Sequence, residues 1–123
     1  MDFHSKKAIY LQIADYICEQ ILQKKLNSGD KIASIREMAI SSEVNPNTVV
    51  RTYAYLEEKR IIVKQRGIGY FVAENAYANT LQLKKSVFLQ QELPAVFRSI
   101  DLLGISFAEL QKLYQAYVHG KRV

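Results

Sequence analysis

The stretch NPNTVVRTY, residues 45–53, joins turn-forming residues directly to β-branched residues and an arginine. Asn45 suits the N-cap of a helix, because its side chain can accept a hydrogen bond from a free backbone N–H. Pro46 suits the first helical position, where its missing N–H would have no partner in any case. Apolar residues then recur at helical spacing: Val49, Tyr53 and Leu56. The stretch therefore predicts a helix that starts here and runs to about Lys59.

A shorter helix is predicted just before it, over about Ile35 to Ser42. Ser34-Ile35-Arg36-Glu37 has the pattern of a capping box, in which Ser34 and Glu37 each bond the other's backbone N–H. Its buried side is expected to consist of Ile35, Met38 and Ala39. A three-residue connection between two such helices, the second with a polar first turn, predicts a helix-turn-helix.

One more helix is predicted upstream and a hairpin downstream. Isoleucines at four-residue spacing indicate a helix from Ala8 to about Lys25, and Gly29 in the following turn fits a left-handed C-terminal residue. Ile61-Ile62-Val63 and Tyr70-Phe71-Val72 indicate two strands around a basic, glycine-bearing turn. Three helices and a hairpin in this order are the layout of a winged helix.

The chain beyond Thr80 is helical in pattern. One apolar stripe steps by four and three residues: Leu89, Leu93, Val96, Ile100 and Leu103. Pro94 should kink this helix or mark its restart, and Ser106-Phe107-Ala108-Glu109 is a second capping box. The helix that follows has an apolar face of its own: Phe107, Leu110, Leu113 and Tyr117. Two helices cannot enclose a core, so these faces need the winged domain or another subunit.

The predicted fold class is therefore mainly α (α+β). It consists of a winged helix-turn-helix domain with a two-stranded wing at residues 1–75, followed by a C-terminal α-helical dimerisation tail at residues 76–123. The 123 residues allow one ordinary domain, or a small domain with an appendage.

Composition excludes several classes of function. The net charge of +5 favours an anionic partner only mildly, so local placement of charge must decide any binding of nucleic acid. A single cysteine, Cys18, allows no internal disulfide, and its apolar neighbours predict a buried, inert thiol. No apolar run has membrane-spanning length, so a cytoplasmic protein is expected. We find no catalytic set, metal spacing or phosphate loop, and we expect neither an enzyme nor a cofactor.

The predicted helix-turn-helix carries side chains suited to DNA. Asn47, Thr48 and Arg51 share one surface opposite the apolar side, where Asn can pair with adenine and Arg can reach guanine or a phosphate. The expected DNA-facing set adds residues of the preceding helix, the cap and the wing: Ser34, Arg36, Asn45, Lys64, Arg66 and Gly67. A capped helix with a solvated face, and a hairpin tip that needs polar residues in any case, would show the same local patterns.

Taken together, these motifs resemble the GntR family of bacterial transcription regulators. The resemblance covers about residues 8–73 and runs through Ile9–Ile13, Gly29–Ala39, Val44–Val49, Leu56-Glu57 and Arg66–Val72. The short tail with Leu103-Gly104-Ile105-Ser106 is similar to the YtrA-type branch. Two positions depart from the usual pattern: Ala33 stands where the family usually has Pro, and Val50 where many members have a basic residue.

The resemblance implies a homodimer that binds an inverted-repeat operator, usually as a repressor and often of an ABC transporter operon. By position, Arg36 would contact DNA from the second helix, Asn47 and Thr48 from the recognition helix, and Gly67 from the wing at the minor groove. The tail helices would form the dimer through an apolar set: Leu89, Leu93, Val96, Phe97, Ile100, Leu103, Leu110, Leu113 and Tyr117.

Two other functions stay open at this stage. A winged helix used as a protein-interaction module would need an apolar exposed face on residues 46–60, and Asn47, Thr48 and Arg51 argue against that. A small-molecule effector that acts through the tail is compatible with DNA binding, and the sequence does not identify one.

Overall fold

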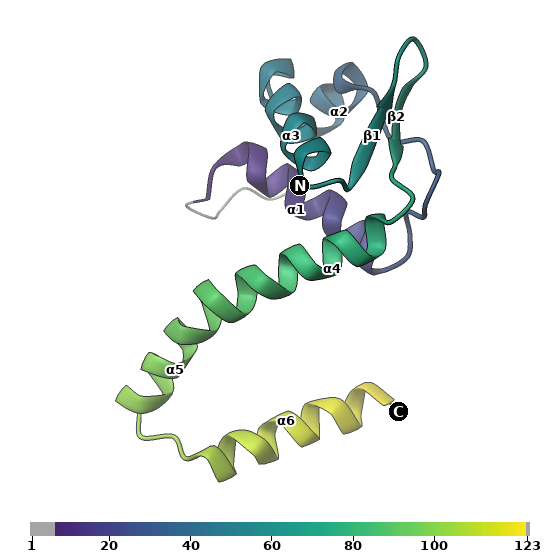
Figure 1. Cartoon of the computed structure of the whole chain (residues 1–123). Coiled ribbons are helices and arrows are strands. Elements are labelled where there is room, and N and C mark those ends of the chain that lie inside the picture. Colours follow the sequence, from purple (N-terminus) through teal and green to yellow (C-terminus); the bar gives the residue numbers. More distant parts are fainter. Residues whose placement is uncertain (1–6, 123) are drawn as a thin grey trace. The chain divides into compact units, whose positions relative to one another are not determined.

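The computed structural model describes residues 7–122 and divides into two compact units, the first ending at Lys84 and the second beginning at Lys85. The first unit packs three helices around one core, with a hairpin beside them (Figure 1): α1 (Ile9–Leu22), α2 (Ile35–Ser42), α3 (Pro46–Glu58), β1 (Ile62–Gln65) and β2 (Gly69–Val72). This is the predicted winged helix-turn-helix with a two-stranded antiparallel wing.

The core of this unit consists of the residues that the helical patterns assign to it. The largest fully buried apolar side chains come from α1, from α3 and from the residue just before β1: Ile13, Ile17, Ile21, Val49, Tyr53, Leu56 and Ile61. The helix α2 adds Met38 and Ala39 to this core. Burying one such side chain contributes about 1.5–3 kcal/mol to stability. The predicted inward face of α3 is thereby confirmed, as is the burial of Cys18, which is 1% exposed.

The bounds of α2 agree with the prediction, but α1 ends earlier than expected. Its last helical residue is Leu22, and Lys24 adopts a left-handed conformation with φ 61°. This conformation ends the helix, so the left-handed residue next to α1 is Lys24, not Gly29 as predicted. Gly29, with φ 87°, instead turns the loop toward β2, where its N–H donates to the Val72 carbonyl.

The wing has a shorter turn than the sequence suggested. Lys64 pairs with Tyr70 and Gln65 with Gly69, so the strands extend to Gln65 and only residues 66–68 form the turn. The Ile68 N–H donates to the Gln65 carbonyl, and Gly67 has φ 78°, as the third residue of a type II turn requires. Lys64 therefore lies in β1 beside the tip, and its expected place in the turn was wrong.

A third segment pairs with the free edge of β2, which the sequence did not predict. Lys31 and Phe71 form an antiparallel bridge, the Ile32 N–H donates to the Tyr70 carbonyl, and the Val72 N–H donates to the Asp30 carbonyl. These bonds attach the wing to the residues that lead into α2. The orientation of the hairpin is therefore fixed relative to the helix-turn-helix.

The helices beyond the wing are α4 (Ala76–Val87), the π-helical turn η1 (Phe88–Glu92), α5 (Leu93–Leu102) and α6 (Phe107–Arg122). The expected boundary after residue 75 coincides with the start of α4, whereas the first compact unit extends to Lys84. The first part of α4 belongs to the core of the first unit, because Ala76 and Thr80 are fully buried and Lys84 Nζ lies 2.7 Å from Asp15 Oδ1.

Pro94 marks a restart of the helix, as predicted. It occupies the first turn of α5, directly after η1, because a proline ring cannot fit inside an uninterrupted α-helix. Gly104, with φ 68°, follows the end of α5. The Ser106 hydroxyl accepts a hydrogen bond from the Glu109 N–H, which caps α6 and is one half of the predicted capping box.

Candidate nucleic-acid interface

The first turn of α3 is capped by the side chain of Asn45. The Asn45 side-chain oxygen accepts a hydrogen bond from the Asn47 N–H at 2.8 Å, and the Thr48 N–H donates to the Asn45 carbonyl at 2.9 Å. The oxygen of Asn45 is thus used within the helix. The Asn47 side chain is exposed, and within residues 7–122 no hydrogen bond occupies its amide, so both its donor and its acceptor are available to a ligand.

Thr48 and Arg51 lie on the same helix but in different surroundings. Thr48 is half-buried, and its carbonyl accepts a bond from the Thr52 hydroxyl at 3.1 Å. Arg51 is exposed, and its guanidinium carbon lies 4.1 Å from the centre of the Tyr10 ring on α1. Sequence reasoning missed Tyr10, because no local pattern relates it to a residue so far along the chain.

The start of α2 shows the predicted capping box in full. The Ser34 hydroxyl accepts from the Glu37 N–H at 3.1 Å, and the Glu37 carboxylate accepts from the Ser34 N–H at 2.9 Å. The hydrogen bond that the Ser34 N–H donates to the carboxylate is the main reason that the pKa of Glu37 lies below its ordinary value, and the Ser34 side chain adds to the effect. Ser34 is therefore committed to the cap. Arg36, in the same turn, is exposed and has no ion pair within the part of the chain that the structure describes.

The wing presents cations next to its turn. Lys64, Arg66 and Gly67 are all exposed, and Lys64 Nζ lies 5.7 Å from the centre of the Tyr70 ring. Lys31 is a further exposed cation that the sequence reasoning did not select, and the bridge to Phe71 places it beside β2. A Cβ atom at Gly69 would lie 3.1 Å from Lys31 Cε, so glycine leaves room for this side chain to cross the hairpin.

Buried hydroxyls fix these elements relative to one another. The Tyr53 hydroxyl donates to the Ala33 carbonyl at 2.6 Å, and its ring lies edge-on to Tyr70 with centres 4.8 Å apart. The Thr52 hydroxyl donates to the Tyr10 carbonyl at 2.8 Å. α3 is thus joined to the entry of α2, to the wing and to α1 by side chains that contact no solvent.

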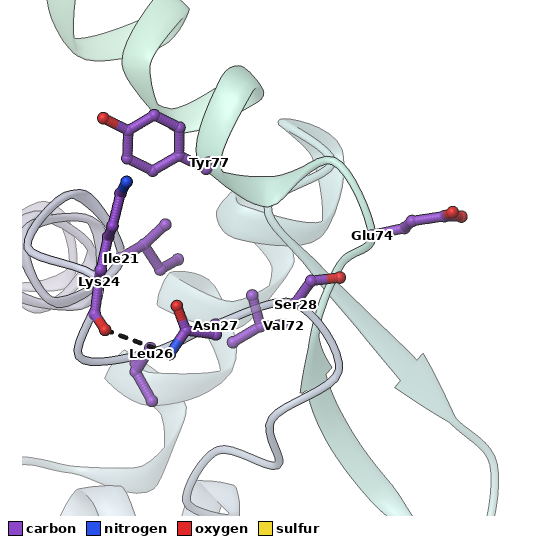
Figure 2. A pocket seen from close by; sticks show the side chains of 8 residues that line it. All are labelled: Ile21, Lys24, Leu26, Asn27, Ser28, Val72, Glu74 and Tyr77. Atoms are coloured by element: carbon purple, nitrogen blue, oxygen red, sulfur yellow. Dashed lines mark hydrogen bonds between the residues drawn. The ribbon is translucent and has the colours of Figure 1, made fainter.

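A cavity of about 430 Å³ is lined by none of the expected DNA-facing residues. It lies between the end of α1, the loop after it, the end of β2 and the start of α4 (Figure 2). Lys24 Nζ lies 5.4 Å from the centre of the Tyr77 ring, and the Asn27 amide donates to the Lys24 carbonyl at 3.2 Å. Glu74 points away from these residues in Figure 2. The residues that line the cavity hold the loop in place, because Lys24 contacts Tyr77 on α4 and Asn27 bonds back to Lys24 within the loop.

The second unit keeps its apolar residues accessible. The structure brings α5 and α6 together around a cavity of about 300 Å³, which five residues of the expected dimer set line: Leu93, Val96, Phe97, Ile100 and Leu110. Phe107, Gln111 and Tyr114 complete the lining. Leu89, Leu103, Leu113 and Tyr117 lie outside it and are 47–71% exposed. From Lys85 to Lys121 no residue is fully buried, so the contact between α5 and α6 covers their apolar faces only in part.

Residues 7–122 form no metal cluster, reactive thiol or membrane-spanning helix. Within residues 7–122, no three His, Cys, Asp or Glu side chains gather closely enough to hold a metal ion. Burial raises the pKa of the Cys18 thiol to about 11, which keeps it protonated and unreactive at neutral pH. Over the same part of the chain, no helix combines the length and apolar character needed to cross a membrane.

Comparison with known proteins agrees with this geometry. Residues 9–72 match the family of bacterial regulatory proteins called the gntR family. The HTH-type transcriptional regulator YhcF of Bacillus subtilis (strain 168) is 38% identical over 96% of both chains. The HTH-type transcriptional repressor YtrA of the same organism is 35% identical over 94% of this chain and 85% of its own.

Solved structures extend the similarity to the whole fold. A GntR-family regulator from Bacteroides thetaiotaomicron superposes with a TM-score of 0.77 at 42% identity, covering 93% of this chain and 99% of the other. A GntR-family regulator from Listeria monocytogenes also superposes with a TM-score of 0.77, at 34% identity, covering 93% and 98%. YtrA from Sulfolobus acidocaldarius, a GntR-family transcription factor, matches 72% of this chain and 93% of its own at 41% identity, with a TM-score of 0.57.

Proposed function

The chain belongs to the gntR family of bacterial regulatory proteins, whose members bind DNA and are typically dimeric, and we propose that it is a dimeric repressor that binds an inverted-repeat operator. The observation that carries the proposal is the first turn of α3. Its backbone is capped by Asn45, while Asn47 and Arg51 stay exposed beside it.

In this proposal α3 enters the major groove, as recognition helices do, with its N-terminal residues toward the base edges. Asn47 supplies a free amide that can pair bidentately with adenine, and Thr48 borders the same groove. Arg36 at the start of α2 binds a phosphate, and Asn45 and Ser34 act through the caps that shape the two helix starts.

The wing contacts DNA beside the groove. Lys64 and Arg66 place two exposed charges near the turn, and Gly67 has no side chain to prevent close approach of its backbone to a phosphate or the minor groove. The bonds between β2 and residues 29–32 support this role, because they fix the wing relative to α2 before DNA arrives.

We propose that a second copy of the chain covers the apolar face of α5 and α6. The nine expected residues are all exposed or half-buried within this unit, and apolar side chains at such density mark an interface. A pair of helices gains stability when its apolar faces meet those of an identical pair, which also produces the two-fold symmetry that an inverted repeat requires.

Repression is proposed because the relative YtrA of B. subtilis is named a transcriptional repressor. Control of an ABC transporter operon follows from the resemblance to the YtrA-type branch. A role on bacterial DNA would place the protein in the cytoplasm, with no catalytic activity of its own. A small-molecule effector that acts through the tail is compatible with this function.

A winged helix that binds a protein through α3 is the alternative. That role would need an apolar exposed face, and α3 exposes Asn47 and Arg51 there instead, with Val50 as its one large apolar side chain that is exposed, at 46%. Sequence-specific binding of duplex DNA by the purified protein separates the two.

The test is a selection from random duplex DNA, followed by titration of the recovered sequence at several salt concentrations. We expect an inverted repeat, a steep salt dependence and, for Asn47→Ala, an altered base preference at the position that Asn47 reads. Failure to recover any repeat would contradict operator binding, and an identical preference for Asn47→Ala would remove Asn47 from readout. The location of the repeat upstream of transporter genes, or elsewhere, decides the proposed target.

A further inference from the structure

We propose that Tyr10 is a positioning residue of the DNA interface, which holds the Arg51 guanidinium against α1 and so commits it to a backbone phosphate instead of a base. This inference rests on the proposed function, because it takes α3 to be the helix that enters the groove. It assigns a DNA-related role to a residue of α1, outside the helix-turn-helix and the wing.

The ring of Tyr10 is a fixed platform. Its own edge-to-face partner is Tyr55 on α3, with ring centres 6.4 Å apart and planes at 77°. Its backbone carbonyl accepts the Thr52 hydroxyl at 2.8 Å, which ties this turn of α1 to α3. A half-buried ring held in this way cannot swing away from its place. The guanidinium of Arg51, 4.1 Å from the ring centre, is well inside the range of a cation–π contact.

Stacking on Tyr10 leaves the hydrogen-bonding edge of Arg51 free. The guanidinium carbon lies over the ring, and a guanidinium that stacks on an aromatic face keeps its N–H groups in its own plane, directed outward. Arg51 is exposed and forms no ion pair with any carboxylate among the described residues. Such a pre-oriented edge suits two oxygens of one phosphate. Two neighbouring N–H groups of a guanidinium can each donate to one of these oxygens, in two parallel hydrogen bonds.

The direction of the side chain favours a phosphate over a base. In a helix-turn-helix the base edges are contacted mainly by the N-terminal residues of the recognition helix, and Arg51 lies one turn further along than Asn47. The contact with Tyr10 directs the Arg51 side chain sideways toward α1. The major groove is about 12 Å wide and is bounded on both sides by phosphates, so a cation at the flank of α3 meets the backbone.

The experiment measures DNA binding of the full chain by fluorescence anisotropy at several salt concentrations. Two duplexes serve as probes, one with the inverted repeat recovered by selection and one scrambled duplex of equal length. Four variants are compared with the wild type: Arg51→Ala, Tyr10→Leu, Tyr10→Phe and the double variant Tyr10→Leu/Arg51→Ala. Thermal melting of each variant checks the fold, and Tyr10→Phe is the matched control, because it keeps the ring.

We expect Arg51→Ala to weaken binding to both duplexes by the same factor and to reduce the slope of log affinity against log salt by about 0.9 for each protomer. Tyr10→Leu should weaken binding roughly two- to fivefold for each protomer, whereas Tyr10→Phe should bind like the wild type. In the Arg51→Ala background, Tyr10→Leu should cost nothing further, since the ring then has no guanidinium to hold.

Three results would overturn the inference while the proposed function stands. These are an equal loss from Tyr10→Leu in both backgrounds, wild-type affinity for Tyr10→Leu, and a changed base preference for Arg51→Ala at an unchanged salt slope. Wild-type protein that binds neither duplex would instead overturn the proposed function itself, and this inference with it.

Discussion

Replacing Tyr53 by phenylalanine removes one hydroxyl and leaves the ring in place. The Tyr53 side chain is fully buried, its hydroxyl donates to the Ala33 carbonyl at 2.6 Å, and its ring packs edge-on against Tyr70. A phenylalanine keeps the ring contact, so the loss is limited to the hydrogen bond. We expect Tyr53→Phe to lower the free energy of unfolding by about 1 kcal/mol, or roughly 4–8 °C in Tm for a domain of this size.

The same hydroxyl gives the prediction a pH dependence. Burial raises the pKa of Tyr53 above its ordinary value of about 10. Because the phenol is neutral when protonated, its contribution to stability is fully present below about pH 10 and is lost as the pH rises toward the folded pKa. Ionisation in the unfolded chain costs the wild type about 1 kcal/mol at roughly pH 10.7. The stability advantage of the wild type over Tyr53→Phe should therefore vanish near that pH.

Urea unfolding followed by circular dichroism, at about pH 8 and about pH 10.7, measures both effects. Tyr16→Phe is the matched control, because Tyr16 on α1 is 44% exposed, and this variant should match the wild type at both pH values. A deficit for Tyr53→Phe that is the same at both pH values would refute the burial argument. The absence of any deficit at about pH 8 would refute the hydrogen bond as a source of stability.

Three further substitutions test other parts of the structure. Asn45→Ala should lower stability by about 1 kcal/mol in thermal melting, because it removes the α3 cap, while Asn45→Asp keeps an accepting oxygen and should melt near the wild type; equal losses would contradict the cap. Arg36→Ala should weaken binding to specific and scrambled duplexes alike and lower the salt slope by about 0.9 per protomer, and an unchanged slope in titrations would remove Arg36 from the interface. Phe97→Glu places a carboxylate in the apolar lining of α5 and should shift sedimentation toward a monomer, whereas Arg98→Glu, outside that lining, should not; a dimeric Phe97→Glu protein would contradict the proposed interface.

The sequence predicted best what local chemistry determines. The capping box at Ser34 and the Asn45-Pro46 pair start their helices at the expected residues, because an N-cap depends only on side chains within one turn. Pro94 was placed correctly for the same reason, since its ring prevents the regular i→i−4 hydrogen bond at that position whatever surrounds it. The inward faces of α1 and α3 followed from a periodicity that any core must satisfy.

Features that depend on distant residues were missed. α1 ends next to a left-handed Lys24, although Gly29 follows in the same loop. Gly29 is needed further along, where the loop bonds to Val72 of β2, so the chain leaves the helix before it. The bridge of Lys31 to Phe71 joins segments that no pattern in the sequence relates. The stack of Arg51 on Tyr10 has the same origin: each residue looks like an ordinary surface residue of its helix until α1 and α3 are packed together.

The position of Tyr53 leads us to expect that stability and DNA binding are coupled in this domain. Its backbone belongs to α3, its hydroxyl holds the carbonyl of Ala33 at the entry to α2, and its ring packs against Tyr70 in the wing. Each of the three elements expected to contact DNA is therefore fixed to one buried side chain. Loss of the hydroxyl frees the entry to α2 but leaves the wing contact intact, because only the first depends on the oxygen. Tyr53→Phe should accordingly weaken the contribution of Arg36 to DNA binding more than that of the wing, and a double-mutant comparison with Arg36→Ala and Arg66→Ala measures this difference.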